Sequence, residues 1–149
     1  MKIEQEIQQK FFKSEHQKLA INLLFTHGWL MSLQKKLFNN SEITTTQYNI
    51  LRILRGQLPN PISINLLKDR MLDKMSDTSR LVERLRLKGY VKREICSNDR
   101  RKSDVSITKK GLKLLEKLDY IDEEFDNLLS SLSKNEAKSL NNLLDKLRD

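Results

Sequence analysis

The sequence predicts a mainly α-helical fold with one small β-hairpin, and three observations support this prediction. Apolar residues recur every three or four positions near both ends of the chain, which is the period of an amphipathic helix. Between Ile62 and Gly111, two short helical patterns precede two stretches with strand propensity. A turn-forming, strongly basic segment separates those two stretches. The length of 149 residues allows one domain, or one whose core a partner completes.

Residues 2–39 are expected to be helical, with a kink or break near Lys13–Gln17. No proline interrupts this segment, and its leucines keep helical spacing. Its aromatic residues add more apolar surface than one helix of a small domain usually buries. A second copy of the chain could cover that surface, and a core helix within one chain is the alternative. The aromatic residues are Phe11, Phe12, Phe25, Trp29 and Phe38.

A break is expected at residues 39–41, before a helix that Thr44 and Gln47 begin with a capping box. In a capping box, each of the two side chains accepts a hydrogen bond from the backbone N–H of the other residue. The helix is expected to end near Gly56–Gln57, and a proline-rich turn at residues 59–61 follows it.

After that turn, Ile62 is expected to form a strand of one or two residues beside the hairpin. Ser63 can cap a short helix through its side-chain oxygen. Residues 71–75 then make the turn to the next helix, and we expect Met71 and Met75 to fill the core.

The helix expected at residues 76–87 has two different faces, with Ser76 as its N-cap and Gly89 as its C-terminal stop. One face is an apolar stripe, and the other carries arginines and short polar groups. Such a polar face can enter a DNA major groove, where arginine pairs with guanine. An ordinary amphipathic helix with a solvated charged face is the alternative. The candidate DNA-binding residues of this helix are Ser76, Asp77, Thr78, Ser79, Arg80 and Arg84.

The hairpin is expected to use Tyr90, Val91 and Ile95 in its first strand and Val105 and Ile107 in its second. Turn formers and then three basic residues lie between the two strands. A basic tip beside a basic helix suits contacts with the DNA backbone or the minor groove. The candidate residues of the tip are Asn98, Asp99, Arg100, Arg101 and Lys102.

The C-terminal part of the chain is expected to contain two amphipathic helices. Thr108 would cap a long helix that runs towards Ser130. Ser133 and Glu136 form a second capping box, which begins the last helix. Together with the N-terminal helix, these two helices suit an intertwined helical dimer interface.

The net charge of +8 is concentrated in the middle of the chain. Residues 68–102 hold 12 Lys and Arg against 6 Asp and Glu, whereas residues 108–149 hold 8 against 9. A basic excess over one helix and one hairpin is typical of a nucleic-acid-binding protein. A basic protein without such a partner is the alternative.

The middle of the chain resembles the MarR-type winged helix-turn-helix transcription regulators. The pattern D-x-R-x-x-x-V-x-x-T-x-x-G of their wing is matched by Asp99, Arg101, Val105, Thr108 and Gly111. The segment DKMSDTSRLVERLRLKGYVKR is similar to their recognition helix and first wing strand. The resemblance implies one MarR-like domain at 1–149, with a winged helix-turn-helix DNA-binding region at 44–111 and a helical dimerisation region at 1–39 and 112–149.

The same resemblance implies a homodimeric transcription regulator that recognises a pseudo-palindromic operator in double-stranded DNA. Two copies of the helix at residues 76–87 would lie in successive major grooves. Asp99 would orient Arg101, so that the wing enters or flanks the minor groove. Two other functions are weaker alternatives: a basic helical interaction module that binds an acidic protein partner, and an enzyme subunit built on this scaffold.

The resemblance further implies a repressor that a small-molecule effector controls. Phe25, Trp29 and Tyr48 could line an effector site, although aromatic residues of a core or an interface would give the same pattern.

The sequence gives no reason to expect an enzyme, a cofactor, a metal site or a membrane segment. It lacks the P-loop, G-x-G-x-x-G and H-E-x-x-H motifs. His16 and His27 would lie about three helical turns apart, too far to share a metal ion in one subunit. The single cysteine, Cys96, has basic neighbours that favour a reactive thiolate, but a passive residue at a strand end is the simpler interpretation. Without a signal peptide or a long apolar run, the protein is expected to be cytoplasmic.

Overall fold

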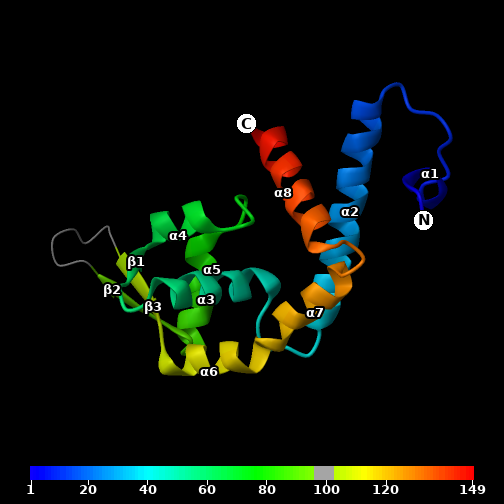
Figure 1. Cartoon of the computed structure of the whole chain (residues 1–149). Helices are drawn as coiled ribbons and strands as arrows, with labels where there is room; N and C mark the ends of the chain where they lie inside the picture. Colours follow the sequence, from blue (N-terminus) through cyan, green and yellow to red (C-terminus); the bar gives the residue numbers. More distant parts are fainter. Residues whose placement is uncertain (96–102) are drawn as a thin grey trace. The chain divides into compact units, whose positions relative to one another are not determined.

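The computed structural model describes residues 1–95 and 103–149, which form two compact units, Met1–Tyr48 and Asn49–Asp149 (Figure 1). Within the described residues, no helix is long and apolar enough to cross a membrane. In chain order, the elements are α1 Ile3–Glu6, α2 Glu15–Leu37, α3 Thr45–Gln57, β1 Ile62–Ser63, α4 Ile64–Arg70, α5 Thr78–Leu87, β2 Val91–Ile95, β3 Ser103–Ile107, α6 Lys109–Leu118, α7 Tyr120–Leu129 and α8 Lys134–Arg148.

The N-terminal segment is interrupted over more residues than the sequence indicated. Helix α1 ends at Glu6, and Gln8 then adopts a left-handed φ of 53°, which an α-helix cannot contain. Ser14 begins α2 by accepting a hydrogen bond from the backbone N–H of Gln17 at 3.1 Å. The expected break near Lys13–Gln17 therefore lies earlier, between the two helices.

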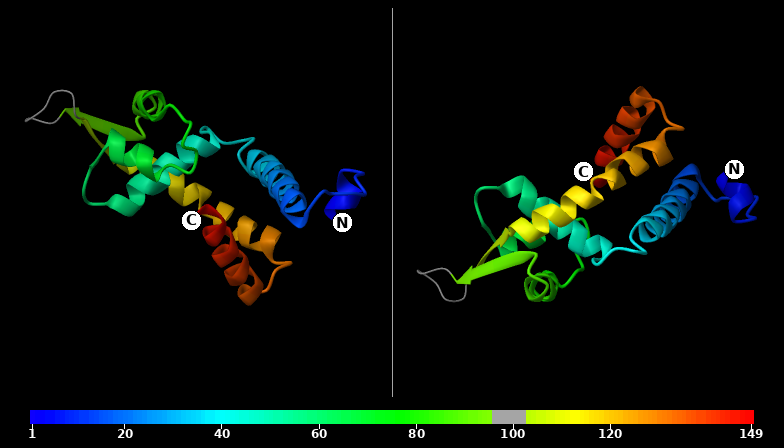
Figure 2. Two further views of the ribbon diagram at one scale, coloured as in Figure 1. Left: turned by 90° about the horizontal axis from the view of Figure 1, so that it is seen from above. Right: turned by 90° about the horizontal axis from the view of Figure 1, so that it is seen from below.

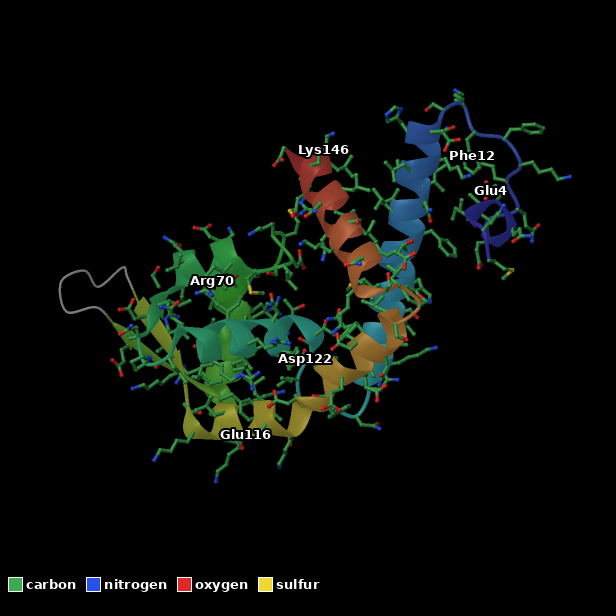
Figure 3. All side chains as sticks on the ribbon, viewed as in Figure 1. Glu4, Phe12, Arg70, Glu116, Asp122 and Lys146 are labelled. Atoms are coloured by element: carbon green, nitrogen blue, oxygen red, sulfur yellow. The ribbon has the colours of Figure 1, made fainter. Side chains whose placement is uncertain are left out.

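The segment before α2 is held against the start of that helix by Lys18. The ammonium group of Lys18 pairs with the carboxylate of Glu4 at 2.5 Å and lies 5.8 Å from the centre of the Phe12 ring (Figure 3). The hydrogen bond from Lys18 is the main reason why the pKa of Glu4 lies below its ordinary value. At the other end of this unit, the buried rings of Phe38 and Tyr48 meet edge to face at 5.0 Å.

The capping box expected before α3 is confirmed. The backbone N–H of Thr44 donates to Oε1 of Gln47 at 3.1 Å, and that of Gln47 donates to Oγ1 of Thr44 at 3.2 Å. The helix ends at Gln57, as the sequence indicated.

The core of the second unit lies between its helices and a small sheet. Every helix from α3 to α7 contributes apolar side chains to it, and burial of each large aliphatic side chain stabilises the fold by about 1.5–3 kcal/mol. The largest fully buried side chains are Ile50, Leu51, Leu67, Met71, Val82, Leu85, Val105, Leu115 and Ile121. The core position expected for Met71 is confirmed, whereas Met75 is 92% exposed, so that part of the prediction is wrong.

The sheet has the antiparallel order β1-β3-β2, and its β2–β3 hairpin extends away from α4 and α5 (Figure 2). Val105 lies at its centre, opposite Ile62 on one side and Arg93 on the other. The short strand expected at Ile62 is therefore confirmed, as are both strands of the hairpin. Residues alternate between buried and half-buried along β3, which fixes the register of the three strands.

The long helix expected between Thr108 and Ser130 is divided at Asp119 into α6 and α7. Two ion pairs from α3 hold the two sides of this division: Arg55 pairs with Asp119 at 2.8 Å, and Arg52 pairs with Asp122 (Figure 3). The apolar periodicity continues through the division, and for that reason the pattern alone indicated one helix.

The capping box expected before α8 is confirmed. The backbone N–H of Ser133 donates to Oε2 of Glu136 at 2.9 Å, and that of Glu136 donates to Oγ of Ser133 at 3.3 Å. The hydrogen bonds from Ser133 keep the pKa of Glu136 below its ordinary value.

Gly111 occupies a position in α6 that no larger residue can fill without a shift of the backbone. A Cβ atom at this position would lie 2.3 Å from the carbonyl oxygen of Tyr90 and 2.7 Å from Cγ1 of Ile107. Gly111→Ala should therefore lower the free energy of unfolding by about 1–3 kcal/mol, the range typical of an overpacked site.

Gly56→Ala is the matched control, because a Cβ atom there would meet nothing within 4 Å. This substitution should raise the free energy of unfolding by up to about 1 kcal/mol through helix propensity. Urea unfolding of both variants measures the difference, and equal effects would contradict the close contact at Gly111.

Candidate nucleic-acid interface

The candidate interface is built around α5. This helix begins one residue later than it would if Ser76 were its N-cap. Asp77 is the N-cap, and its carboxylate accepts a hydrogen bond from the backbone N–H of Arg80 at 3.1 Å. The hydroxyl of Ser76 instead donates to the carbonyl oxygen of Asp73 at 2.8 Å. The prediction of Ser76 as the N-cap is therefore wrong. A carboxylate is favoured at this position because it also meets the positive end of the helix dipole.

The turn before α5 is organised by Asp73. Its side chain accepts a hydrogen bond from the backbone N–H of Met75 at 2.9 Å, which is an Asx turn. Leu72 and Met75 are 84% and 92% exposed, so two apolar side chains stand on the surface at the tip of the helix-turn-helix. The exposure of this pair was not expected from the sequence, where the Asx-turn spacing of Asp73 and Met75 was the available signal.

The inward face of α5 is fixed by Val82 and Leu85, which are fully buried. Thr78 lies on the same side of the helix and is only 3% exposed. Its hydroxyl is buried and has no hydrogen-bond partner among the described residues. In this conformation Thr78 is therefore not part of the exposed face on which the sequence placed it.

The outward face of α5 carries Ser79, Arg80 and Arg84, all of which are exposed. Over residues 1–95 and 103–149, neither arginine forms a hydrogen bond or an ion pair through its guanidinium group. Both cations are therefore free to meet an anionic partner. A guanidinium group presents a rigid fork of donors that fits the acceptors of guanine or of a phosphate.

Arg86 lies on the same helix but is already paired. Its Nε and Nη2 atoms donate to the two carboxylate oxygens of Glu83 at 2.9 and 2.7 Å. The hydrogen bond from Arg86 lowers the pKa of Glu83, and the same pair raises the pKa of Arg86. The i, i+3 spacing of the two residues predicts such a pair. Glu83 also lies three positions from Arg80, but both of its carboxylate oxygens accept hydrogen bonds from Arg86, and Arg84 has no acidic residue three or four positions away.

The C-terminal end of α5 is closed by Gly89, whose φ of 79° suits glycine. Its backbone N–H donates to the carbonyl oxygen of Arg86 at 2.9 Å, and that of Tyr90 donates to the carbonyl oxygen of Leu85 at 3.0 Å. This pair of hydrogen bonds is a Schellman motif. Gly89 therefore ends the helix as the sequence predicted, and both ends of α5 are held by local hydrogen bonds.

The hairpin places the two ends of the predicted basic tip on neighbouring strands, since Ile95 pairs with Ser103. The Nε atom of Arg93 donates to Oγ of Ser103 at 2.8 Å near the point where the described strands end. The tip residues Asn98, Asp99, Arg100, Arg101 and Lys102, together with Cys96, lie outside the described residues.

In the part of the chain that the structure describes, no three His, Cys, Asp or Glu side chains form a group that could hold a metal ion. The exposed residues of the candidate site are cations, hydroxyls and a capping carboxylate. This set of groups is suited to binding an anionic polymer.

Comparison with known proteins gives consistent matches. The sequence model of the MarR family matches residues 41–102. The HTH-type transcriptional regulator FarR of Neisseria gonorrhoeae is 26% identical over 136 residues, which cover 91% of this chain and 92% of FarR.

Two solved structures share the fold. A MarR variant from E. coli in complex with operator DNA has a TM-score of 0.78 at 23% identity, over 93% of this chain and 99% of that one. NadR in complex with 4-hydroxyphenylacetate has a TM-score of 0.69 at 26% identity, over 93% of this chain and 97% of that one.

The position of α5 should depend on the carboxylate of Asp77. Asp77→Ala removes the acceptor for the backbone N–H of Arg80 and should lower the free energy of unfolding by about 0.5–2 kcal/mol. Asp77→Asn should retain most of the stability, because the amide oxygen accepts the same hydrogen bond. Ser79→Ala is the control on the exposed face and should cause no loss. Thermal unfolding of the three variants tests the assignment, which fails if Asp77→Ala is as stable as Ser79→Ala.

Proposed function

Because this chain is a MarR-type winged helix-turn-helix transcription regulator and not an enzyme, we propose that it binds double-stranded DNA as a homodimer. Each protomer places α5 in a major groove of a pseudo-palindromic operator, so that the two α5 helices lie about 34–36 Å apart. The complex of E. coli MarR with operator DNA, which shares this fold, supports the proposal. A regulator of this kind acts in the cytoplasm, where its operator is accessible.

The observation that carries the proposal is the pair of free cations on α5. Arg80 and Arg84 lie on the outward face of a helix whose two ends and inward face are fixed. A rigid helix with two free guanidinium groups can select bases by paired hydrogen bonds at the floor of the groove. Ser76 and Ser79 lie at the N-terminal tip, where hydroxyls and backbone N–H groups meet phosphates, and Asp77 between them caps the helix.

The wing adds contacts that set affinity and register. We assign these contacts to residues 98–102, because the sequence pattern of the wing places three basic side chains there. In this assignment, Asp99 holds Arg101 by a charge-assisted hydrogen bond, so that the guanidinium group reaches the minor groove or its flank.

The dimer is proposed from the apolar surface at both ends of the chain. Neither α2 nor α8 has a buried residue, and large apolar side chains on both helices are exposed. On α8, Leu140, Leu143 and Leu147 are 44%, 63% and 55% exposed and follow the i, i+3, i+7 spacing of one helix face. A second copy of the chain would cover these surfaces and bring two α5 helices to one operator.

We propose that the regulator is a repressor whose DNA binding a small molecule controls. NadR, which is 26% identical, was solved with 4-hydroxyphenylacetate, and this complex supports a small-molecule effector for a protein of this fold. Of the three aromatic residues considered for such a site, Tyr48 is buried against Phe38, which fits a core residue. Phe25 and Trp29 are 39% and 43% exposed on α2.

Arg80→Ala and Arg101→Ala should change DNA binding in different ways. Loss of Arg80 should relax the preference at one base position of each half-site, with a cost of about 1–3 kcal/mol of discrimination. Loss of Arg101 should weaken binding to many sequences, because wing contacts go mainly to the backbone. Selection of duplexes from a random pool, followed by titration of the selected duplex, measures both effects.

The double variant Glu83→Ala/Arg86→Ala is the control on α5, since it removes a mutually neutralised ion pair and leaves no unpaired carboxylate three positions from Arg80. Its sequence preference should match that of the parent protein. A relaxed preference in the double variant Glu83→Ala/Arg86→Ala, or an unchanged one in Arg80→Ala, would overturn the assignment of Arg80. A parent protein that selects no duplex and binds acidic proteins instead would overturn the proposed function.

Leu143→Glu should weaken the dimer, because it places a charged group in an apolar interface. Burying an unpaired carboxylate is costly enough to raise the dimer dissociation constant by more than about tenfold. Asn142→Glu adds the same charge at the neighbouring position, off the leucine stripe, and should leave the dimer nearly unchanged. Sedimentation equilibrium of both variants measures the effect. Equal dissociation constants would exclude this face of α8 from the interface.

A further inference from the structure

The first turn of α6 holds the C-terminal end of α5 through three consecutive carbonyl groups. The backbone N–H of Thr108 donates to the carbonyl oxygen of Tyr90 at 3.0 Å, and its hydroxyl donates to that of Gly89 at 2.7 Å. The ammonium group of Lys110 donates to the carbonyl oxygen of Lys88 at 2.7 Å. These carbonyls lie at the C-cap of α5 and in the two residues that follow it, and the end of an α-helix leaves its last C=O groups without partners.

The side chain of Lys110 is held along its length. A Cβ atom on Gly89 would lie 3.6 Å from Cδ of Lys110, so the stem passes over Gly89 at contact distance. The ammonium group lies 4.9 Å from the centre of the Tyr90 ring, which is itself buried. A cation over an aromatic ring is attracted by the negative face of that ring. Lys110 therefore has a defined position, although much of it is exposed.

Two neighbouring lysines show that this position is particular to Lys110. Lys109 and Lys113 lie on the same helix and are exposed, and neither forms an ion pair or a side-chain hydrogen bond with any residue in 1–95 or 103–149. The contrast provides a matched control, since each lysine contributes the same charge to the same helix.

The charge of Lys110 meets the negative end of the α5 dipole. A cation within the last turn of a helix stabilises it, and the carboxylate of Asp77 occupies the equivalent position at the positive end. The two ends of α5 thus carry charges of opposite sign to the dipole, one supplied from its own N-cap and the other from α6. Of these two charges, only that of Lys110 links α5 to another element.

We propose that Lys110 is a positioning residue for α5: it fixes the end of the helix against α6, so that the exposed arginines are presented in one orientation. This inference rests on the proposed reading of DNA by α5. Lys110 acts through Lys88 and Tyr90 and makes no contact with the nucleic acid itself.

The test compares Lys110→Met, Lys110→Arg and the control Lys113→Met in the full-length protein. Methionine keeps an unbranched apolar stem and removes the cation, whereas arginine keeps both a cation and a donor. The first measurement is amide hydrogen exchange of Gly89 and Tyr90 in the free protein, since their N–H groups form the last hydrogen bonds of α5. The second is affinity for a duplex that the parent protein has selected from a random pool, at several salt concentrations.

Lys110→Met should speed exchange at Gly89 and Tyr90 by roughly threefold to tenfold, as expected for loss of a cation at a helix C-terminus. It should weaken binding to the selected duplex by a similar factor, with the same dependence on salt as the parent protein. Lys110→Arg should retain much of the slow amide exchange and much of the affinity for the duplex. Lys113→Met should leave the exchange of Gly89 and Tyr90 unchanged.

Unchanged exchange in Lys110→Met would overturn the proposal. So would a salt dependence reduced by about one counterion, because that result would make Lys110 a direct phosphate contact. If the parent protein selects no duplex, the proposed function fails and the positioning role fails with it. Faster exchange in Lys110→Met would still identify a cap on α5, so the two failures are distinguishable.

Discussion

The close approach of Gly111 to Tyr90 is the contact on which the second unit depends. Tyr90 follows α5 directly and precedes β2, while Gly111 lies in the first turn of α6. A backbone-to-backbone contact at this point leaves no room for a side chain, so it sets the separation of α5, the sheet and α6 together. The hydrogen bonds of Thr108 to Gly89 and Tyr90 form only at this separation. The packing constraint at Gly111 therefore acts on the position of α5 together with the buried face and the caps of the helix itself.

The features of the fold that could be predicted were those set by local interactions. The capping boxes of α3 and α8, the caps at Ser63 and Thr108, and the left-handed glycine after α5 each involve residues a few positions apart. Spacing along the sequence shows such features directly. Features that depend on distant partners were missed. The division at Asp119 is held by two arginines of α3, which lie 64 and 70 positions before their partners, and the apolar spacing does not mark it.

In the candidate site, too, local features could be predicted from the sequence and features that depend on distant partners could not. The apolar stripe identified the inward face of α5, and it follows that Arg80 and Arg84 point outward. The inward position of Thr78 was not evident, because a threonine at a helix start fits a polar face or a small buried site equally well. Glu83 lies three positions from both Arg80 and Arg86, so only the structure shows that it pairs with Arg86. The hydrogen bond from Lys110 to the end of α5 also requires the fold, since 22 positions separate Lys110 from Lys88.

The carboxylate of Asp77 has a consequence for how the protein would search a genome. It is a fixed negative charge at the tip of the helix that is proposed to enter the groove, and the cap prevents it from moving away. Non-specific binding to DNA is almost entirely electrostatic, so this charge shortens each visit to a random sequence. At the operator, the proposed base contacts of the arginines would compensate for the repulsion. A residue that stabilises the helix would thereby also raise the rate at which the protein leaves incorrect sites, so that it samples more of the genome in a given time.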